Sequence, residues 1–264
     1  MFEKINLTYN KLTSYIRPLP DFIIIGAQKS GTSSLHKYLC QHPNIKSSFK
    51  KEVHFFDRDL NLSGGEFWYR SYFPLRISHD TKIFEASPSY LFNPLVPCRI
   101  NDLLPNVKLI IMLRNPVERA ISHYFHSKKL KRENTTIYEA LTTEESRIHK
   151  AVSEKNYNSY EFINFSYKIR GIYKPQIEHY LDFFSREKIL IINSESFFSK
   201  PESTLSKVFN FVDVAPDFRP LDLTPERVGS NKVTVDLEIY EYLNKFFAQH
   251  NQDLYDLIGE SYNW

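Results

Sequence analysis

The chain has 264 residues, and its 34 Lys and Arg residues against 31 Asp and Glu give a formal net charge of +3. A hydrophobic fraction of 42%, with 21 Phe and 17 Tyr, is enough for a large buried core and excludes a disordered or collagen-like chain. So small a charge does not predict nucleic acid as a partner, although it allows a local anion site. We expect a single domain over residues 1–264, with residues 1–17 as a loose arm or an added helix.

No segment is typical of a membrane span, a secretion signal or a disulfide framework. The longest wholly apolar run, residues 109–113, is far shorter than the roughly 18 residues that indicate a membrane helix. The first twenty residues contain no continuous apolar stretch followed by a cleavage site. Cys40 and Cys98 form neither a disulfide framework nor a metal-binding pattern. These features predict a cytoplasmic protein with no membrane and no metal partner, and they do not predict its oligomeric state.

Three short apolar runs, at residues 21–25, 108–113 and 188–192, predict buried parallel strands. Helical patterns lie between and after them, at residues 32–42, 117–184 with breaks near Asn134 and Asn156, 201–212 and 235–258. Strands that alternate with helices favour an α/β fold, in which helices flank a central, mostly parallel sheet. Ligands of such sheets bind at the carboxyl ends of the strands, where two motifs of this chain are found.

The first motif, Gly26 to Ser34, joins the first strand to its helix. The start of a helix offers unpaired backbone amides and binds phosphate readily, and Lys29 adds a positive charge. A Walker A loop has the pattern G-x-x-x-x-G-K-[ST], but here Thr32 stands where that lysine belongs. The pattern predicts a P-loop-like, phosphate-binding strand-loop-helix, and an ordinary polar turn is the alternative.

The second motif, Arg114-Asn115-Pro116, follows the second strand and opens a helix. Arg119 and Ser122 are three residues apart and share a face of that helix. A guanidinium and a hydroxyl together can bind a phosphate group. Alone, the motif is equally typical of a capped helix start, and Arg119 suits a structural ion pair as well as a phosphate contact. With the first motif, it predicts a nucleotide that carries two separate phosphate groups.

The chain resembles the sulfotransferases that use 3′-phosphoadenosine 5′-phosphosulfate (PAPS), most closely the heparan-sulfate type. Residues 26–35 are similar to the 5′-phosphosulfate loop of this family, and residues 51–57 (KEVHFFD) to its Lys-Glu-Pro-His-Phe-Phe-Asp segment. Further matches follow in the family's order, at residues 68–69, 85–90 and 262–264. The resemblance implies PAPS as donor, 3′,5′-ADP (PAP) as product and no metal.

The resemblance also implies roles for individual residues. Glu52 matches the catalytic base, Lys29 would stabilise the leaving group, and His54 would orient Glu52 or the acceptor, unless it is a structural histidine. Tyr173 lies near the nucleotide or simply packs in the core, and Arg227 and Lys232 match a basic loop over the phosphates only loosely. The implied donor-binding residues are Lys29, Ser30, Gly31, Thr32, Ser33, Ser34, Arg114, Ser122, Tyr173, Arg227 and Lys232.

Two departures from the heparan-sulfate type affect the expected acceptor. Ala86 stands where the 3-O enzymes carry a lysine, and their C-terminal disulfide has no counterpart here. Losing a cation that would face the acceptor argues against a highly sulfated polymer. We therefore expect the hydroxyl or amine of a small-molecule metabolite or natural product as acceptor, with a carbohydrate as the second choice.

Two other functions remain open from the sequence. A P-loop kinase is disfavoured by the displaced lysine and by Arg114, which takes the place of a magnesium-binding acid at the strand end. A non-catalytic module that binds a nucleotide or a sulfated glycan would not need Glu52. The basic run of residues 128–132 is typical of a solvated helix end, and a contact with an acidic glycan is the alternative.

Overall fold

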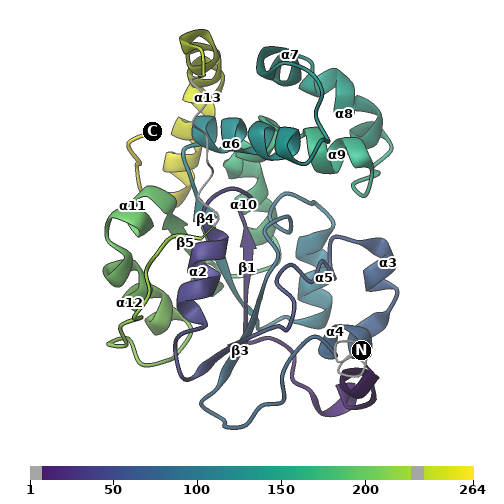
Figure 1. Cartoon of the computed structure of the whole chain (residues 1–264), viewed down its shortest axis with the longest axis vertical. Helices are drawn as coiled ribbons and strands as arrows, with labels where there is room; N and C mark the ends of the chain where they lie inside the picture. The colour runs from purple at the N-terminus through teal and green to yellow at the C-terminus, as the bar shows by residue number, and fades with distance from the viewer. Residues whose placement is uncertain (1–7, 227–234) are drawn as a thin grey trace.

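The computed structural model describes residues 8–226 and 235–264 (Figure 1). Its centre is a parallel sheet of five strands in the order β2-β3-β1-β4-β5. The strands are β1 (Phe22–Gly26), β2 (Ile45–Ser47), β3 (Lys82–Ala86), β4 (Lys108–Leu113) and β5 (Ile189–Asn193). The expected α/β fold with a central parallel sheet is therefore confirmed.

Helices cover both faces of the sheet and one of its ends (Figure 1). Among the described residues, no helix is both long and apolar enough to span a membrane. The helices are α2 (Thr32–Leu39), α3 (Asp59–Leu62), α4 (Gly65–Arg70), α5 (Val96–Leu103), α6 (Pro116–Lys129), α7 (Ile137–Thr142), α8 (Glu144–Ser153), α9 (Tyr160–Phe165), α10 (Tyr173–Leu181), α11 (Ser194–Ser199), α12 (Pro201–Phe211) and α13 (Leu237–Ile258), with the 3-10 turns η1 (Ser14–Ile16), η2 (Ile169–Gly171) and η3 (Arg186–Lys188).

The two faces of β1 build two separate cores, because successive side chains of a strand point to opposite sides. Phe22 and Ile24 face α2, α11 and α12, while Ile23 and Ile25 face α4, α5, α10 and the end of α13. All five residues of β1 are buried, as expected for a strand in the middle of a covered parallel sheet. A third core joins α6, α7 and α13 above the sheet.

Strands β2 and β3 were not predicted from the sequence. β2 has only three residues, and the charged residues Lys82 and Glu85 interrupt the apolar pattern of β3. Glu85 is nevertheless fully buried, and its carboxylate accepts hydrogen bonds from Tyr69 Oη (2.7 Å) and Ser87 Oγ (3.2 Å). These bonds satisfy the buried carboxyl group and allow it to occupy an inner strand.

The topology gathers three strand ends at one edge of the sheet. β1 pairs in parallel with β3 on one side and with β4 on the other, so Ile24 lies between Ala86 and Ile110. Helix α6, which begins three residues after β4, crosses above this carboxyl edge (Figure 1). The segments that follow β1, β3 and β4 therefore lie next to one another.

The described part of the N-terminal arm packs against the domain through Arg17. Its guanidinium is buried and donates hydrogen bonds to the carbonyl of Phe73 (2.6 Å) and to Thr13 Oγ1 (2.9 Å). Leu12 and Tyr15 point outward and are more than two-thirds exposed. Residues 8–17 thus form an added helical segment on the side of α4.

Candidate active site

The loop after β1 turns sharply into α2. Lys29 and Gly31 have left-handed backbones, with φ angles of 72° and 89°, and Gly31 is the N-cap of α2. A Cβ on Gly31 would lie 2.9 Å from the Phe198 ring, and one on Gly26 would lie 2.4 Å from Leu91 Cβ. A side chain at either position would therefore collide with a neighbouring side chain. The turn leaves the first amides of α2 at the carboxyl edge of the sheet.

The hydroxyl side chains of this loop have different surroundings. Thr32 and Ser33 lie in the first turn of α2, and Ser30 precedes Gly31 and is buried. The Ser34 hydroxyl accepts a hydrogen bond from the backbone N–H of Glu226 at 2.8 Å. In this structure Ser34 therefore anchors the segment at residues 223–226 across α2, so its hydroxyl is engaged away from the loop.

The two predicted anion sites are in direct contact through Arg114, at the end of β4. Its Nη1 donates a hydrogen bond to the backbone carbonyl of Lys29 at 3.2 Å, and its Nη2 lies 3.5 Å from Glu118 Oε2. Ser122 lies on α6 and is largely buried. The side chain of Asn115 accepts bonds from the amides of Val117 and Glu118 and fixes the start of this helix.

Tyr173 holds the backbone of Arg114 in place. Its ring is buried at the start of α10, and its hydroxyl donates a hydrogen bond to the carbonyl of Arg114 at 2.8 Å. Burial raises the pKa of Tyr173 to about 12, so the hydroxyl keeps its proton and stays a donor. Arg227 and Lys232 lie outside the described residues.

The third part of the site is Glu52, whose backbone is tied to the end of β3. Its N–H donates to the carbonyl of Ala86 at 3.0 Å, and its left-handed φ of 63° turns the side chain out of the extended path. Glu52 Oε1 lies 2.9 Å from Lys51 Nζ, and Oε2 lies 3.6 Å from His54 Nε2. The carboxylate is 36% exposed, so it is open to an incoming acceptor.

Behind Glu52, His54 is held by a buried acid. The Nδ1 of His54 lies 3.0 Å from Asp57 Oδ2, and Ser89 Oγ donates to the same carboxylate oxygen at 2.5 Å. Burial alone would lower the pKa of His54, but Asp57 and Glu52 outweigh it and raise the pKa to about 9. His54 is therefore an imidazolium at neutral pH, with its Nε2–H directed at Glu52. We call Glu52, His54 and Asp57 the acid-histidine relay.

The relay keeps both of its carboxyl groups ionised. Burial would raise the pKa of Glu52, but His54 and Lys51 lower it to about 2. Burial likewise acts against ionisation of Asp57, whose pKa is lowered by His54 and Ser89. Glu52 is thus a carboxylate throughout the physiological pH range, in the protonation state that a proton acceptor needs.

A second buried network fixes the backbone of the relay. The N–H of His54 donates to Ser87 Oγ at 3.3 Å, and Ser87 in turn donates to Glu85. Burial raises the pKa of Glu85 to about 7. The sequence showed residues 85–90 only as a family match and gave no role to Asp57, Glu85 or Ser89. The signal for Asp57 was present, as the second acid of the segment that contains Glu52, whereas nothing in the sequence alone marks Ser89.

Among the described residues, no group of three or more His, Cys, Asp or Glu side chains could hold a metal ion. The basic run at residues 128–132 is partly engaged within the protein. Lys128 Nζ donates to the carbonyls of Asn134 (3.0 Å) and Thr135 (3.1 Å), and Arg132 donates to Asn164 Oδ1 at 3.2 Å.

Curated proteins with similar sequences are sulfotransferases. Heparan sulfate glucosamine 3-O-sulfotransferase 5 of Homo sapiens is 30% identical, over 96% of this chain and 76% of its own length. The membrane-associated sulfotransferase kil1 of Dictyostelium discoideum is 28% identical over 93% of this chain. The chain spans 66% of the length of kil1.

Solved structures and a family model agree with these relatives. A sulfotransferase from Alicyclobacillus acidocaldarius is 34% identical with a TM-score of 0.77, and the match covers 93% of this chain and 98% of the other. Mouse sulfotransferase SULT7A1, solved with PAP, shares the fold at a TM-score of 0.53 and 14% identity, over 93% of this chain and 90% of its own. The model of the sulfotransferase domain matches residues 19–250. The predicted resemblance is thereby confirmed, and the chain belongs to the sulfotransferase family.

Proposed function

We propose that the protein transfers the sulfuryl group of PAPS to a hydroxyl group of a carbohydrate acceptor. The observation that carries this proposal is the hydrogen bond between the two predicted anion sites, after β1 and after β4. The acid-histidine relay lies at the end of β3, the other neighbour of β1. Lys29 and Arg114 follow adjacent strands and touch through one hydrogen bond, and Glu52 is tied to the end of β3 on the other side of β1. One ligand with anionic groups at two positions can bridge such sites.

The residues present fit a donor of this kind. The first amides of α2 and the charge of Lys29 would hold its 5′ end, since a helix N-terminus favours anions. Arg114 and Ser122 would hold its 3′-phosphate, for which Arg114 would exchange its contacts with Lys29 and Glu118. The relatives' family and a PAP-bound structure of the same fold support this assignment.

When bound, PAPS supplies the sulfuryl group and leaves as 3′,5′-ADP. The acceptor oxygen forms the new S–O bond while the bond from sulfur to the bridging phosphate oxygen breaks. Glu52 would take the proton of the acceptor hydroxyl, and Lys29 would stabilise the charge that develops on the leaving oxygen. His54, charged and fixed by Asp57, orients the carboxylate of Glu52. Transfer of this type resembles phosphoryl transfer, in which positioning and charge stabilisation supply most of the catalysis.

The choice of a carbohydrate rests on the relatives and departs from the first preference drawn from the sequence. Two 3-O-sulfotransferases named for heparan sulfate are 30% identical to this chain over 96% of its length. Ala86, which favoured a small-molecule acceptor, is buried beside β1 and so presents no group to an acceptor. A small-molecule hydroxyl is therefore the alternative that the assay must include.

The test is transfer of labelled sulfate from PAPS to a panel of sugars and small-molecule alcohols. We expect product without added magnesium, and calorimetry should show tighter binding of 3′,5′-ADP than of 5′-AMP. Equal affinities for the two nucleotides would contradict the second anion site. Magnesium-dependent turnover of ATP in place of sulfate transfer would instead indicate the kinase that the sequence left open.

A further inference from the structure

A buried basic cluster lies beside the site and has no role in the mechanism above. Arg119 and His123 belong to α6, and Arg170 belongs to η2. These three side chains, which we call the basic cluster, are 0%, 2% and 5% exposed. Arg119 is among the largest fully buried side chains of the described residues. Arginine is almost never fully buried unless it is paired, so the cluster needs a physical explanation.

Contacts within the protein leave most of the cluster's donors unused. Arg119 Nη2 donates to the carbonyl of Tyr167, and Arg170 Nη2 donates to the carbonyl of Ile163. Within residues 8–226 and 235–264, the Nε and Nη1 atoms of both arginines and His123 Nδ1 are buried without a hydrogen-bond partner. Each buried polar group left without a partner destabilises the folded state, because it has given up its hydrogen bonds to water. Neither arginine forms an ion pair there, so the structural ion pair considered for Arg119 is not found.

The two arginines of the cluster also repel each other. The nearby acid is Glu144, whose carboxylate accepts the N–H groups of Lys168 (2.5 Å) and Ile169 (3.0 Å) and whose pKa burial raises to about 7. Glu144 acts electrostatically on both guanidinium groups and Asp57 acts in addition on that of Arg170, but neither acid forms an ion pair with them within the described residues. Burial, and then the charge of Arg119, lowers the pKa of Arg170 to about 9. An oxyanion bound among these groups would remove both the repulsion and the missing hydrogen bonds.

The position of the cluster points toward the acceptor. Arg170 interacts electrostatically with Asp57 and Arg58, on the relay side, and the guanidinium carbon lies 4.3 Å from the centre of the half-buried Phe92 ring. The turn that carries Arg170 is pressed against α6, because a Cβ on Gly171 would lie 2.9 Å from Pro116 Cβ. In the proposed function, Lys29 and Arg114 already bind the two anionic ends of the donor. The electrostatic interaction with Asp57 thus puts the unused donors of Arg170 on the relay side of the donor site, which is the side on which the acceptor would lie.

We propose that the basic cluster is a subsite for an anionic group of the acceptor, a carboxylate or a sulfate or phosphate ester. This inference rests on the proposed function and adds the charge of the substrate to it. The subsite supplies from α6 and η2 the positive charge that Ala86, the last residue of β3, lacks. The Phe92 ring covers Arg170 and stacks on Phe162, with centroids 4.7 Å apart, so the anion reaches the guanidinium by displacing this ring.

The first experiment uses inorganic sulfate as the probe. The donor site is saturated with 3′,5′-ADP, and sulfate is then titrated by calorimetry. We expect one further site, weakened at least tenfold in Arg119→Met and Arg170→Met and unchanged in Arg219→Met, which removes an exposed guanidinium 3.9 Å from Glu202. Equal sulfate affinity in all four proteins would overturn the proposal. So would a loss of 3′,5′-ADP affinity in Arg119→Met as large as in Arg114→Ala, because the cluster would then serve the donor.

The second experiment separates a free anion from an anionic acceptor. 4-Nitrophenyl glucoside and 4-nitrophenyl glucuronide differ only in whether carbon 6 is a hydroxymethyl or a carboxylate. We expect kcat/KM to favour the glucuronide at least tenfold, and Arg170→Met to bring the ratio close to one. An unchanged ratio in Arg170→Met would show that the cluster holds only a free ion. If PAPS supports no transfer to any acceptor, the proposed function fails, while the sulfate titration still decides whether the subsite exists.

Thermal unfolding tests whether the basic cluster has only a structural role. Apolar replacement of a buried, poorly paired charge is often neutral or stabilising. We therefore expect Arg170→Met to keep or raise the melting temperature while it loses the sulfate site, and Arg170→Lys to retain weaker sulfate binding. A lower melting temperature in Arg170→Met, together with intact sulfate affinity, would assign the cluster to folding alone.

Discussion

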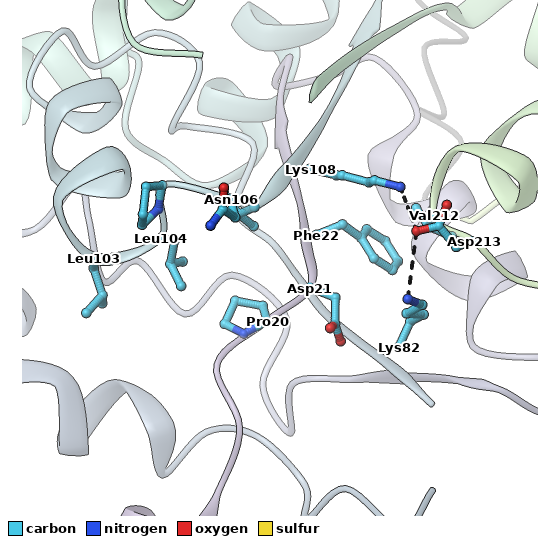
Figure 2. A pocket seen from close by; sticks show the side chains of 12 residues that line it. Pro20, Asp21, Phe22, Lys82, Leu103, Leu104, Asn106, Lys108, Val212 and Asp213 are labelled. Atoms are coloured by element: carbon cyan, nitrogen blue, oxygen red, sulfur yellow. Dashed lines mark hydrogen bonds and ion pairs between the residues drawn. The ribbon is translucent and has the colours of Figure 1, made fainter. Parts of the chain in front are cut away.

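The two ends of the sheet differ in how their charges are satisfied. At the amino end, a hollow of about 400 Å³ is lined by the starts of β1, β3 and β4 (Figure 2). Its charges neutralise one another, since Asp213 lies 2.7 Å from Lys108 Nζ and 3.8 Å from Lys82 Nζ. Asp21 is likewise paired with Arg76 at 2.9 Å. Within the described parts of the chain, no side chain that lines this hollow has a buried polar atom without a hydrogen-bond partner.

At the carboxyl end, the protein keeps buried donors without partners and three strained backbones, whereas the amino-end hollow has one such backbone, Asp213, with a φ of 58°. Lys29, Glu52 and His54 have φ angles between 58° and 72°, a left-handed conformation that costs non-glycine residues about 1–2 kcal/mol each. The unused donors of Arg119 and Arg170 lie at the same end. Strained backbones persist where surrounding contacts hold them, and they cluster at functional sites. The comparison teaches that the proposed site is distinguished by buried polar groups without partners, and not by the volume of a hollow.

The largest effect should come from Glu52→Gln. The amide cannot accept the acceptor's proton, so we expect turnover to fall by about 10²–10⁴-fold while 3′,5′-ADP binding is kept. Single-turnover transfer of labelled sulfate and calorimetry measure the two properties. Glu66→Gln, which alters an exposed acid 2.6 Å from Arg70, is the control. Full turnover in Glu52→Gln would remove the relay from the mechanism and favour the non-catalytic module.

Arg114→Ala should act on donor binding. A charge-assisted hydrogen bond is worth about 1.5–3 kcal/mol, so we expect 3′,5′-ADP to bind roughly 10–100-fold more weakly. Binding of 5′-AMP, which lacks the 3′-phosphate, should change little. An equal loss for both nucleotides, measured by calorimetry, would show that Arg114 only supports the Lys29 loop through their hydrogen bond.

Gly31→Ala tests whether the loop between β1 and α2 tolerates a side chain at its left-handed glycine. A methyl group there meets both a φ of 89° and the Phe198 ring at 2.9 Å. Gly65→Ala is the matched control, because Gly65 has a φ of 74° and no heavy atom within 4 Å of the added Cβ. We expect Gly65→Ala to cost about 1 kcal/mol and Gly31→Ala about 1–3 kcal/mol more in urea unfolding. Equal losses of unfolding free energy in the two variants would mean that the Phe198 ring moves aside at no cost.

Asp57→Asn should change the pH dependence of stability. The pKa of His54 is raised from 6.5 to about 9, so its stabilising contribution is complete below pH 6.5 and is lost as the pH rises through about 9. Without the charge of Asp57, this loss should occur about 1–3 pH units lower. Urea unfolding between pH 6 and pH 10 measures the shift. Coincident profiles for the two proteins would show that Asp57 does not hold the proton of His54.

The sequence predicted the parts of the fold that depend on continuous apolar runs. β1, β4 and β5 appeared as such runs, and α2, α6, α12 and α13 lie where helical patterns were predicted, whereas α3, α4, α5 and α11 were not predicted. β3 was missed because Glu85 is stabilised by partners distant in sequence, such as Tyr69, and no local pattern shows that pairing. β2 is too short for its periodicity to be seen.

Prediction of the candidate site from the sequence was limited in the same way, to residues that local patterns reveal. Lys29, Arg114 and Glu52 could be proposed from the sequence because each belongs to a recognisable motif. The basic cluster was not found, because it forms only when η2 packs against α6, some fifty residues away along the chain. Arg119 was noticed, but whether it had a partner could only be decided by the fold.

The smallest effect is expected at the amino end. Asp213→Asn removes the charge shared by Lys82 and Lys108, and Asn accepts the φ of 58° that Asp213 has. Exposed ion pairs contribute little, so the free energy of unfolding should fall by less than about 1 kcal/mol, with turnover and 3′,5′-ADP affinity unchanged. Turnover reduced as strongly as in Glu52→Gln would give the amino-end hollow a part in the reaction. The charges there would then be paired only until a ligand arrives, and the contrast between the two ends would no longer locate the chemistry.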